Sequence, residues 1–136
     1  MSRVIKFRAW DTRKNKMYSA EELGQDELTI NPDGRGFVNV SSSSQRLSQY
    51  MYHIHPLQFT GLLDKNGKEI YEGDILKIEH EERDTIITDV KMMDGAFCVK
   101  SSWNEYYPMA SLARPGDGLE IIGNIYEHSH LLPGVK

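Results

Sequence analysis

Two pairs of histidines have a spacing that places both rings of a pair on one face of a β-strand. The pairs are His53 with His55 and His128 with His130. Side chains two positions apart in a strand point the same way, so each pair could contribute two ligands to one metal ion. A metal site needs a third or fourth ligand, and Glu127 and His80 have suitable side chains but no supporting local spacing. We therefore expect no metal site and no cofactor, and we place the second pair in a frayed C-terminal tail.

Two carboxylates, Glu72 and Asp74, lie on either side of Gly73. They could work as a general acid and base. The favoured interpretation is structural, with Asp74 accepting backbone hydrogen bonds at a tight corner, as aspartates in turns usually do. Cys98 lies between apolar residues of an expected strand, which favours a buried thiol over a catalytic nucleophile. No glycine-rich run has the context of a phosphate-binding loop, so we predict no catalytic residues and no enzyme.

The N-terminal segment combines cations with an aromatic side chain. Lys6, Arg8 and Trp10 alternate along an expected strand and share one face, which would suit backbone contact and base stacking in a nucleic acid. For Trp10 we favour a place at the rim of the core over a cation–π role. Residues 1–17 carry six Lys and Arg residues against Asp11, but the net charge of −4 argues against a general nucleic-acid binder. The candidate binding residues are Lys6, Arg8, Trp10, Tyr71, Glu72 and Asp74.

The length and composition are those of one soluble domain. The chain has 136 residues, of which 39% are hydrophobic and 26% are charged, so we expect a single domain over residues 1–136. No apolar run approaches the roughly 18 residues of a membrane span, and the N-terminus lacks the apolar centre of a signal peptide. With one cysteine and no internal disulfide, these features favour a cytoplasmic protein that does not enter a membrane.

The stretch of residues 58–78 constrains the backbone most tightly. Asn66-Gly67 predicts a type I′ hairpin turn, in which both central residues take a positive φ. Gly73-Asp74 predicts a tight corner, and a strand is expected from Ile75 to Glu79.

The other expected strands follow apolar alternation, with a turn about every ten residues. A second hairpin covers residues 3–20, a strand over 47–60 is broken near Pro56, and Asp94-Gly95 is a further type I′ turn. We also expect strands at 37–40, 84–93, 96–100 and 119–126 and a turn at 31–36. A short helix is expected after Pro108, a helical turn or a loop at 21–30, and a loop at the serines 41–44.

This pattern predicts a mainly β protein. We expect a small bent β-barrel with an SH3-like core over residues 58–101, an extra N-terminal hairpin, and one short helix or two. The similarity to SH3-like barrels is one of shape and carries no function. Exposed strand edges invite pairing with another chain, and self-association would cover them, so we expect a homo-oligomer.

Three segments carry a resemblance to a known family. They are Phe7-Arg8-Ala9-Trp10-Asp11, Phe59-Thr60-Gly61-Leu62-x-Asp64-x-Asn66-Gly67-x-Glu69-Ile70-Tyr71-Glu72-Gly73-Asp74-Ile75 and Ile122-Gly123-Asn124-Ile125-Tyr126-Glu127. In this order they resemble the YopX family, small proteins of bacterial phages and prophages. The resemblance implies a mainly β fold, self-association and life in an infected or lysogenic bacterial cell. It implies no catalytic residues.

Two functions stay open on the sequence. The first is a non-enzymatic, oligomeric interaction module of a phage or prophage that binds an unknown phage or host protein. The alternative is a nucleic-acid-binding accessory factor that uses the basic N-terminal hairpin. An enzyme built on Glu72, Asp74 or the histidines ranks behind both.

Overall fold

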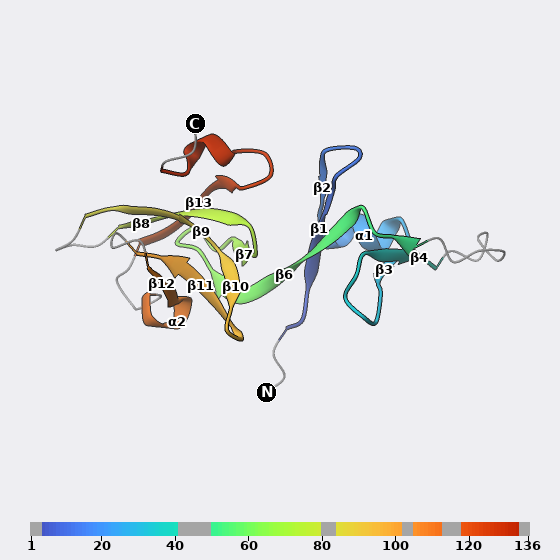
Figure 1. Ribbon diagram of the computed structural model, residues 1–136, viewed down its shortest axis with the longest axis horizontal. Coiled ribbons are helices and arrows are strands. Elements are labelled where there is room, and N and C mark those ends of the chain that lie inside the picture. Colours follow the sequence, from blue (N-terminus) through green and yellow to red (C-terminus); the bar gives the residue numbers. More distant parts are fainter. Residues whose placement is uncertain (1–3, 41–49, 80–83, 102–104, 113–117, 134–136) are drawn as a thin grey trace. The chain divides into compact units, whose positions relative to one another are not determined.

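Short strands joined by tight turns make up most of the computed structural model (Figure 1). It describes residues 4–40, 50–79, 84–101, 105–112 and 118–133. The chain divides into two compact units, unit 1 (Met1–Phe59) and unit 2 (Thr60–Lys136). Each unit has its own cluster of buried apolar side chains, so the two are described separately. A single domain over residues 1–136 stays a prediction.

Unit 1 is built from short antiparallel strands and one helix. Its elements are β1 (Phe7–Asp11), β2 (Lys16–Tyr18), α1 (Ala20–Gln25), β3 (Leu28–Ile30), β4 (Phe37–Asn39), β5 (Tyr50–Met51) and the first residues of β6 (Ile54–Leu63). β1 lies between β2 and β6, and β4 lies between β3 and β5. The predicted N-terminal hairpin is confirmed, with strands shorter than the range 3–20.

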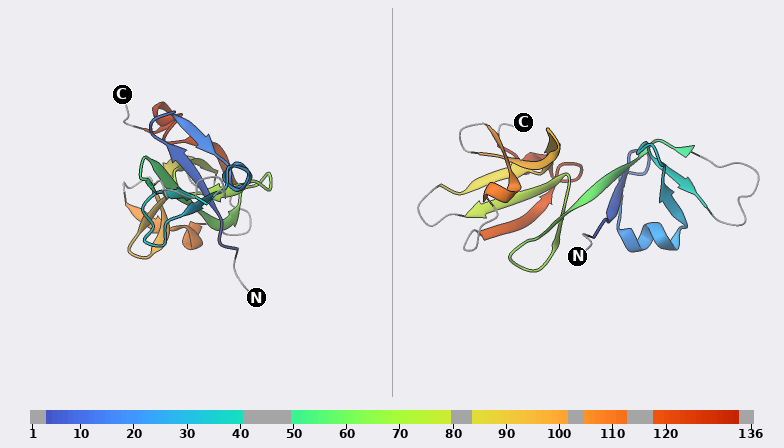
Figure 2. Two further views of the ribbon diagram at one scale, coloured as in Figure 1. Left: turned by 90° about the vertical axis from the view of Figure 1, so that its right-hand side faces the viewer. Right: turned by 90° about the horizontal axis from the view of Figure 1, so that it is seen from below.

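The helix α1 resolves the ambiguous segment 21–30. The Ser19 side chain accepts a hydrogen bond from the Glu22 backbone at 3.1 Å, and the Glu22 carboxylate accepts one from the Ser19 backbone at 3.0 Å. This reciprocal cap satisfies two helix N–H groups that would otherwise lack partners. Leu23 then packs into the core of unit 1 with Ala9, Tyr18, Phe37 and Ile54, and α1 lies beside β1 and β3 (Figure 2). The expected serine loop lies outside the described residues.

Unit 2 begins within β6 and contains most of the strands. Its elements are β7 (Glu69–Tyr71), β8 (Asp74–Glu79), β9 (Ile86–Asp89), β10 (Lys91–Met93), β11 (Ala96–Lys100), β12 (Tyr106–Pro108), α2 (Met109–Leu112), β13 (Gly118–Asn124) and the 3-10 helix η2 (Ser129–Leu131). β8 lies between β13 and β9, and β11 lies between β10 and β12. The predicted short helix directly after Pro108 is confirmed by α2.

The strands of unit 2 curl around one apolar core. Ile70, Leu76, Ile78 and Val99 are almost completely buried there, and Met109 of α2 packs against them. The result is a small, bent half-barrel, so the prediction of a mainly β fold with one short helix or two is confirmed (Figure 1). In the described residues, no helix is both long and apolar enough to cross a membrane.

The two predicted type I′ turns have different outcomes. At Asp94-Gly95 both residues have positive φ, 50° and 82°, and the turn is confirmed. At Asn66-Gly67 only Gly67 has a positive φ, 80°, so the type I′ prediction is wrong there. The reason is Asp64, whose Oδ1 accepts the N–H groups of Asn66 and Lys68, so that the loop closes over this carboxylate as a longer turn.

Two predicted strand boundaries are also corrected. β6 runs through Pro56: it pairs with β1 on both sides of the proline, and at the two ends of this pairing the N–H of Phe59 donates to the carbonyl of Lys6 and the N–H of Thr12 to the carbonyl of His53. Backbone N–H and C=O groups alternate between the two sides of a strand, and Pro56 is out of phase with residues 53 and 59, so the N–H that it lacks would face away from β1. The strand expected over 84–93 is split into β9 and β10 at Val90, which bonds instead with the backbone of Gly73 and Asp74.

Candidate functional site

The N-terminal hairpin carries the first group of predicted binding residues. Arg8 and Trp10 lie two residues apart in β1, and the carbonyl of Lys6, just before the strand, accepts from the Phe59 amide. The Lys6 ammonium lies 3.5 Å from the Glu21 carboxylate. Trp10 is only 7% exposed, so its ring is packed more deeply than the expected core rim. Little ring surface is left for stacking on a base.

Exposed cations gather instead at the tip of this hairpin. Arg13, Lys14 and Lys16 are exposed in and after the turn that follows β1. Asp11 holds the turn, since its Oδ1 accepts the N–H groups of Arg13 at 2.9 Å and Lys14 at 3.0 Å. The ammonium of Lys16 lies 3.3 Å from Glu22, and this hydrogen bond raises the pKa of Lys16. The accessible positive charge of unit 1 therefore includes the hairpin tip.

The second group of predicted residues builds the corner between β7 and β8. Asp74 is buried, and its Oδ2 accepts the N–H of Tyr71 at 2.8 Å, which confirms the predicted structural role. Tyr71 is buried as well, and its hydroxyl donates to Glu69 at 3.3 Å. A binding role for Tyr71, Glu72 and Asp74 stays a prediction.

The first histidine pair has a carboxylate beside one ring. Nε2 of His53 lies 3.9 Å from Oδ1 of Asp11, which is too long for a hydrogen bond, whereas His55 is exposed on β6. Within the described ranges, no three His, Cys, Asp or Glu side chains gather as a metal ion would require. His80 lies outside those ranges, and Cys98 is buried, as predicted.

The second histidine pair is not in a frayed tail, and that prediction is wrong. The backbone N–H of Asn124 donates to Nδ1 of His128 at 3.1 Å, and η2 follows directly. The Asn124 side chain accepts the N–H groups of Tyr126 and Glu127, which closes the turn after β13. An imidazole that accepts at Nδ1 acts here as a turn-holding group.

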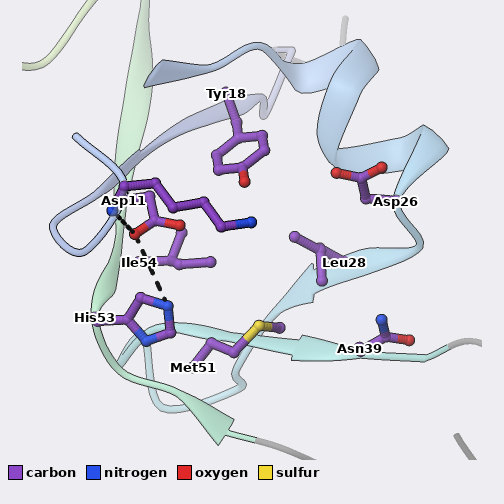
Figure 3. A pocket seen from close by; sticks show the side chains of 9 residues that line it. Asp11, Tyr18, Asp26, Leu28, Asn39, Met51, His53 and Ile54 are labelled. Carbon is purple, nitrogen blue, oxygen red and sulfur yellow. Dashed lines mark hydrogen bonds and ion pairs between the residues drawn. The ribbon is translucent and has the colours of Figure 1, made fainter. Parts of the chain in front are cut away.

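Unit 1 also contains a pocket of about 330 Å³ that the sequence did not reveal (Figure 3). It is lined by Asp11, Lys14, Tyr18, Asp26, Leu28, Asn39, Met51, His53 and Ile54. Leu28, Met51 and Ile54 provide an apolar wall, and the remaining side chains are polar or charged. Such a combination of apolar surface with a few convergent polar groups is typical of small-molecule sites.

The polar groups of the pocket are arranged on opposite sides. Asp11 and His53 lie on one side and Asp26 on the other, and the Tyr18 hydroxyl points into the space (Figure 3). Tyr18 is 5% exposed, and its hydroxyl forms no hydrogen bond with any residue that the structure describes. Likewise, the side chains of Lys14 and Asp26 form no ion pair within the described part of the chain. These groups are therefore available to a ligand.

An exposed aromatic pair marks a different surface of unit 1. Tyr50 in β5 is 57% exposed and Tyr52, two residues on, is 56% exposed. Their rings are stacked, with centroids 5.8 Å apart and planes 5° from parallel. Among the described strands, β5 pairs only with β4, so Tyr50 lies on an edge strand and Tyr52 in the turn that follows it.

Sequence reasoning missed both of these features for different reasons. The pocket residues come from separate stretches of the chain that only the pairing of β1 with β6 and of β4 with β3 and β5 brings together. The alternation of Tyr50 and Tyr52 was visible in the sequence, but nothing local distinguishes exposed tyrosines from core tyrosines. Burial is a property of the assembled strands.

These features define a small, mainly β protein with an N-terminal hairpin unit and a half-barrel unit. A family model described as "YopX protein" matches residues 6–133, and the chain belongs to the YopX family. The resemblance seen in the sequence is confirmed.

Two solved structures are similar to the chain over almost its whole length. The crystal structure of protein EF1440 from Enterococcus faecalis is 26% identical, with a TM-score of 0.60, and the match covers 96% of this chain and 99% of that one. The crystal structure of yopX from Bacillus subtilis is 20% identical, with a TM-score of 0.62. Here the match covers 96% of this chain and 97% of the yopX chain. The second likeness supports the fold alone. The search of curated proteins finds no match.

Proposed function

We propose that this YopX-family protein is a phage- or prophage-encoded accessory protein that works without catalysis as an oligomeric interaction module. Its partners would be further copies of itself and a phage or host protein, in the cytoplasm of a bacterial cell. The observation that carries the proposal is the exposed, stacked pair of Tyr50, on the edge strand β5, and Tyr52, in the turn after it.

The tyrosine pair has the chemistry of an interface. Tyrosine offers a large, fairly rigid surface with an apolar body and a polar tip, and it is enriched where proteins associate. Tyr50 and Tyr52 are both more than half exposed, and their stacking presents them as one surface. An edge strand adds backbone N–H and C=O groups that a strand of a second copy can pair with. Together these properties favour self-association through β5.

Mass measurement by light scattering tests this proposal. The full chain is expected to be an oligomer at micromolar concentration, and the double variant Tyr50→Ser, Tyr52→Ser is expected to be a smaller species with an unchanged circular dichroism spectrum. Tyr107→Ser is the matched control, because Tyr107 is also an exposed strand tyrosine, at 39%, but belongs to β12 in unit 2. A strictly monomeric wild-type protein would overturn the proposed self-association.

The exposed cations at the hairpin tip support a second candidate function, a nucleic-acid-binding accessory factor. Arg13 and Lys14 are exposed together, while the net charge of −4 restricts binding to such a local patch. Fluorescence anisotropy with short single- and double-stranded DNA, repeated at rising salt, tests it. Binding that weakens with salt and is lost in Arg13→Gln, Lys14→Gln but not in Lys68→Gln would support this function. No binding at low salt would remove it.

A further inference from the structure

We propose that the pocket of unit 1 binds a small zwitterion with an apolar side group, the chemistry of a free apolar amino acid. The juxtaposition that carries the proposal is a cation, a hydroxyl that points into the pocket, a carboxylate on the side opposite Asp11 and His53, and an apolar wall. The proposal is independent of the assembly through β5.

The carboxylate of such a ligand has two complementary groups in the pocket. Lys14 supplies an ammonium and Tyr18 a hydroxyl, and both groups lack a protein partner within the described residues. The Tyr18 ring is buried, but its hydroxyl opens to the pocket and forms no hydrogen bond within the described residues. A ligand carboxylate would satisfy it with a charge-assisted hydrogen bond, which is stronger than a neutral one.

The ammonium of the ligand has its partner across the pocket. Asp26 lines the side opposite Asp11 and His53 in Figure 3, and its carboxylate forms no ion pair within the described chain. Asp26 lies at the C-terminal end of α1, where its backbone caps the helix and holds the residue in place. A ligand amine therefore has an acceptor on the side of the pocket opposite Asp11 and His53.

The balance of charge in the pocket favours a zwitterion over an ion of either sign. Asp11 and Asp26 carry negative charge and Lys14 carries positive charge, so the pocket offers partners of both signs. A net anion would meet the two aspartates, and a net cation would meet Lys14. A zwitterion pairs with groups of both signs and adds no net charge to the pocket.

The apolar wall and the volume define the rest of the ligand. Leu28, Met51 and Ile54 offer a surface for an aliphatic or thioether side group, which gains the free energy of apolar burial. The volume of about 330 Å³ is at the lower end of known ligand pockets, which begin at roughly 300 Å³. An amino acid would fit within this volume.

Calorimetric titration of the full chain with L-leucine tests the proposal. L-Leucine is expected to bind more tightly than glycine, which lacks the apolar group, and more tightly than N-acetyl-L-leucinamide, which lacks both charges. Lys14→Met and Asp26→Asn should each weaken leucine binding about tenfold, the effect of losing one charged partner. The controls Lys68→Met and Asp94→Asn make the same changes outside the pocket and should leave binding unchanged.

Two further ligands test which pocket residue pairs with each charge of leucine. Lys14→Met should leave the affinity for L-leucinamide, which has no carboxylate, nearly unchanged, and Asp26→Asn should do the same for N-acetyl-L-leucine, which has no ammonium. Both residues are exposed, so neither substitution disturbs the core. The proposal is overturned if leucine fails to bind at millimolar concentration, if the uncharged N-acetyl-L-leucinamide binds as tightly, or if both variants bind leucine like the wild type.

Discussion

Oδ2 of Asp64 accepts a hydrogen bond from the backbone N–H of Ile121 at 3.1 Å, although 57 positions separate the two residues. The same carboxylate accepts through Oδ1 from Asn66 at 2.8 Å and Lys68 at 2.9 Å. Next to it, the N–H of Lys65 donates to the carbonyl of Leu119 at 2.8 Å. One buried side chain thus closes the turn between β6 and β7 and ties it to β13, so the middle segment of the family resemblance is bound to the final strand.

Replacing Asp64 with Asn should destabilise the protein by about 1–3 kcal/mol, because an amide has only one oxygen for the three N–H groups now served by two. Urea unfolding at neutral pH measures the change. Asp94→Asn is the matched control, since Asp94 is exposed in a turn and Asn tolerates its positive φ of 50°. Equal stabilities of the two variants would contradict a special role for Asp64.

Acid stability should depend on the same carboxylate. Burial tends to raise the pKa of Asp64, but hydrogen bonds from the N–H groups of Lys68, Ile121 and Asn66 outweigh it and hold this pKa below its usual value. A carboxyl whose pKa is lower in the folded state contributes stability above its unfolded pKa and loses it as pH falls through the folded value. Urea midpoints below about pH 4 should therefore fall more steeply in the wild type than in Asp64→Asn. Parallel acid profiles would refute this linkage.

Gly73→Ala should destabilise the protein more than Gly67→Ala. Both glycines have positive φ, 85° and 80°, so each substitution carries backbone strain of about 1 kcal/mol. A Cβ on Gly73 would also lie 2.8 Å from Cε2 of Tyr126, whereas a Cβ on Gly67 would meet nothing within 4 Å. The difference in unfolding free energy between the two variants therefore reports the packing of the corner against the turn after β13. No difference would show that Tyr126 moves aside at no cost.

Thr88→Val should cost about 1–3 kcal/mol despite its nearly unchanged shape. The Thr88 hydroxyl is buried, accepts the N–H of Lys100 at 2.7 Å and donates to the carbonyl of Asp89 at 3.2 Å. Valine would leave the Lys100 N–H without this acceptor between β9 and β11. Thr29→Val, at an exposed position of β3, is the control and should change the thermal midpoint little.

Ser19→Ala should destabilise unit 1 by about 1 kcal/mol, because it removes the acceptor that caps α1. Glu22→Gln keeps the reciprocal cap and loses only the exposed ion pair with Lys16, so its effect should be smaller. Thermal unfolding followed by circular dichroism compares the two. A larger loss from Glu22→Gln would mean that the ion pair, rather than the cap, holds the helix.

The sequence by itself determined the features that depend on a few neighbouring residues. The Asp94-Gly95 turn, the Gly73-Asp74 corner and the helix after Pro108 all follow from local φ and ψ preferences or from a side chain that bonds its own backbone. The mainly β class follows in the same way from alternation and turn spacing.

Only the tertiary structure decided which side chains are buried and which converge. Trp10 is buried through the pairing of β1 with β2 and β6, and the turn at Asp64 is held against β13 by the N–H of Ile121. The residues that line the pocket come from β1 to β6 and the end of α1, so the pocket forms only when these elements are in place. Strand pairing over long separations depends on the packing of whole surfaces, and no local pattern of residues encodes it.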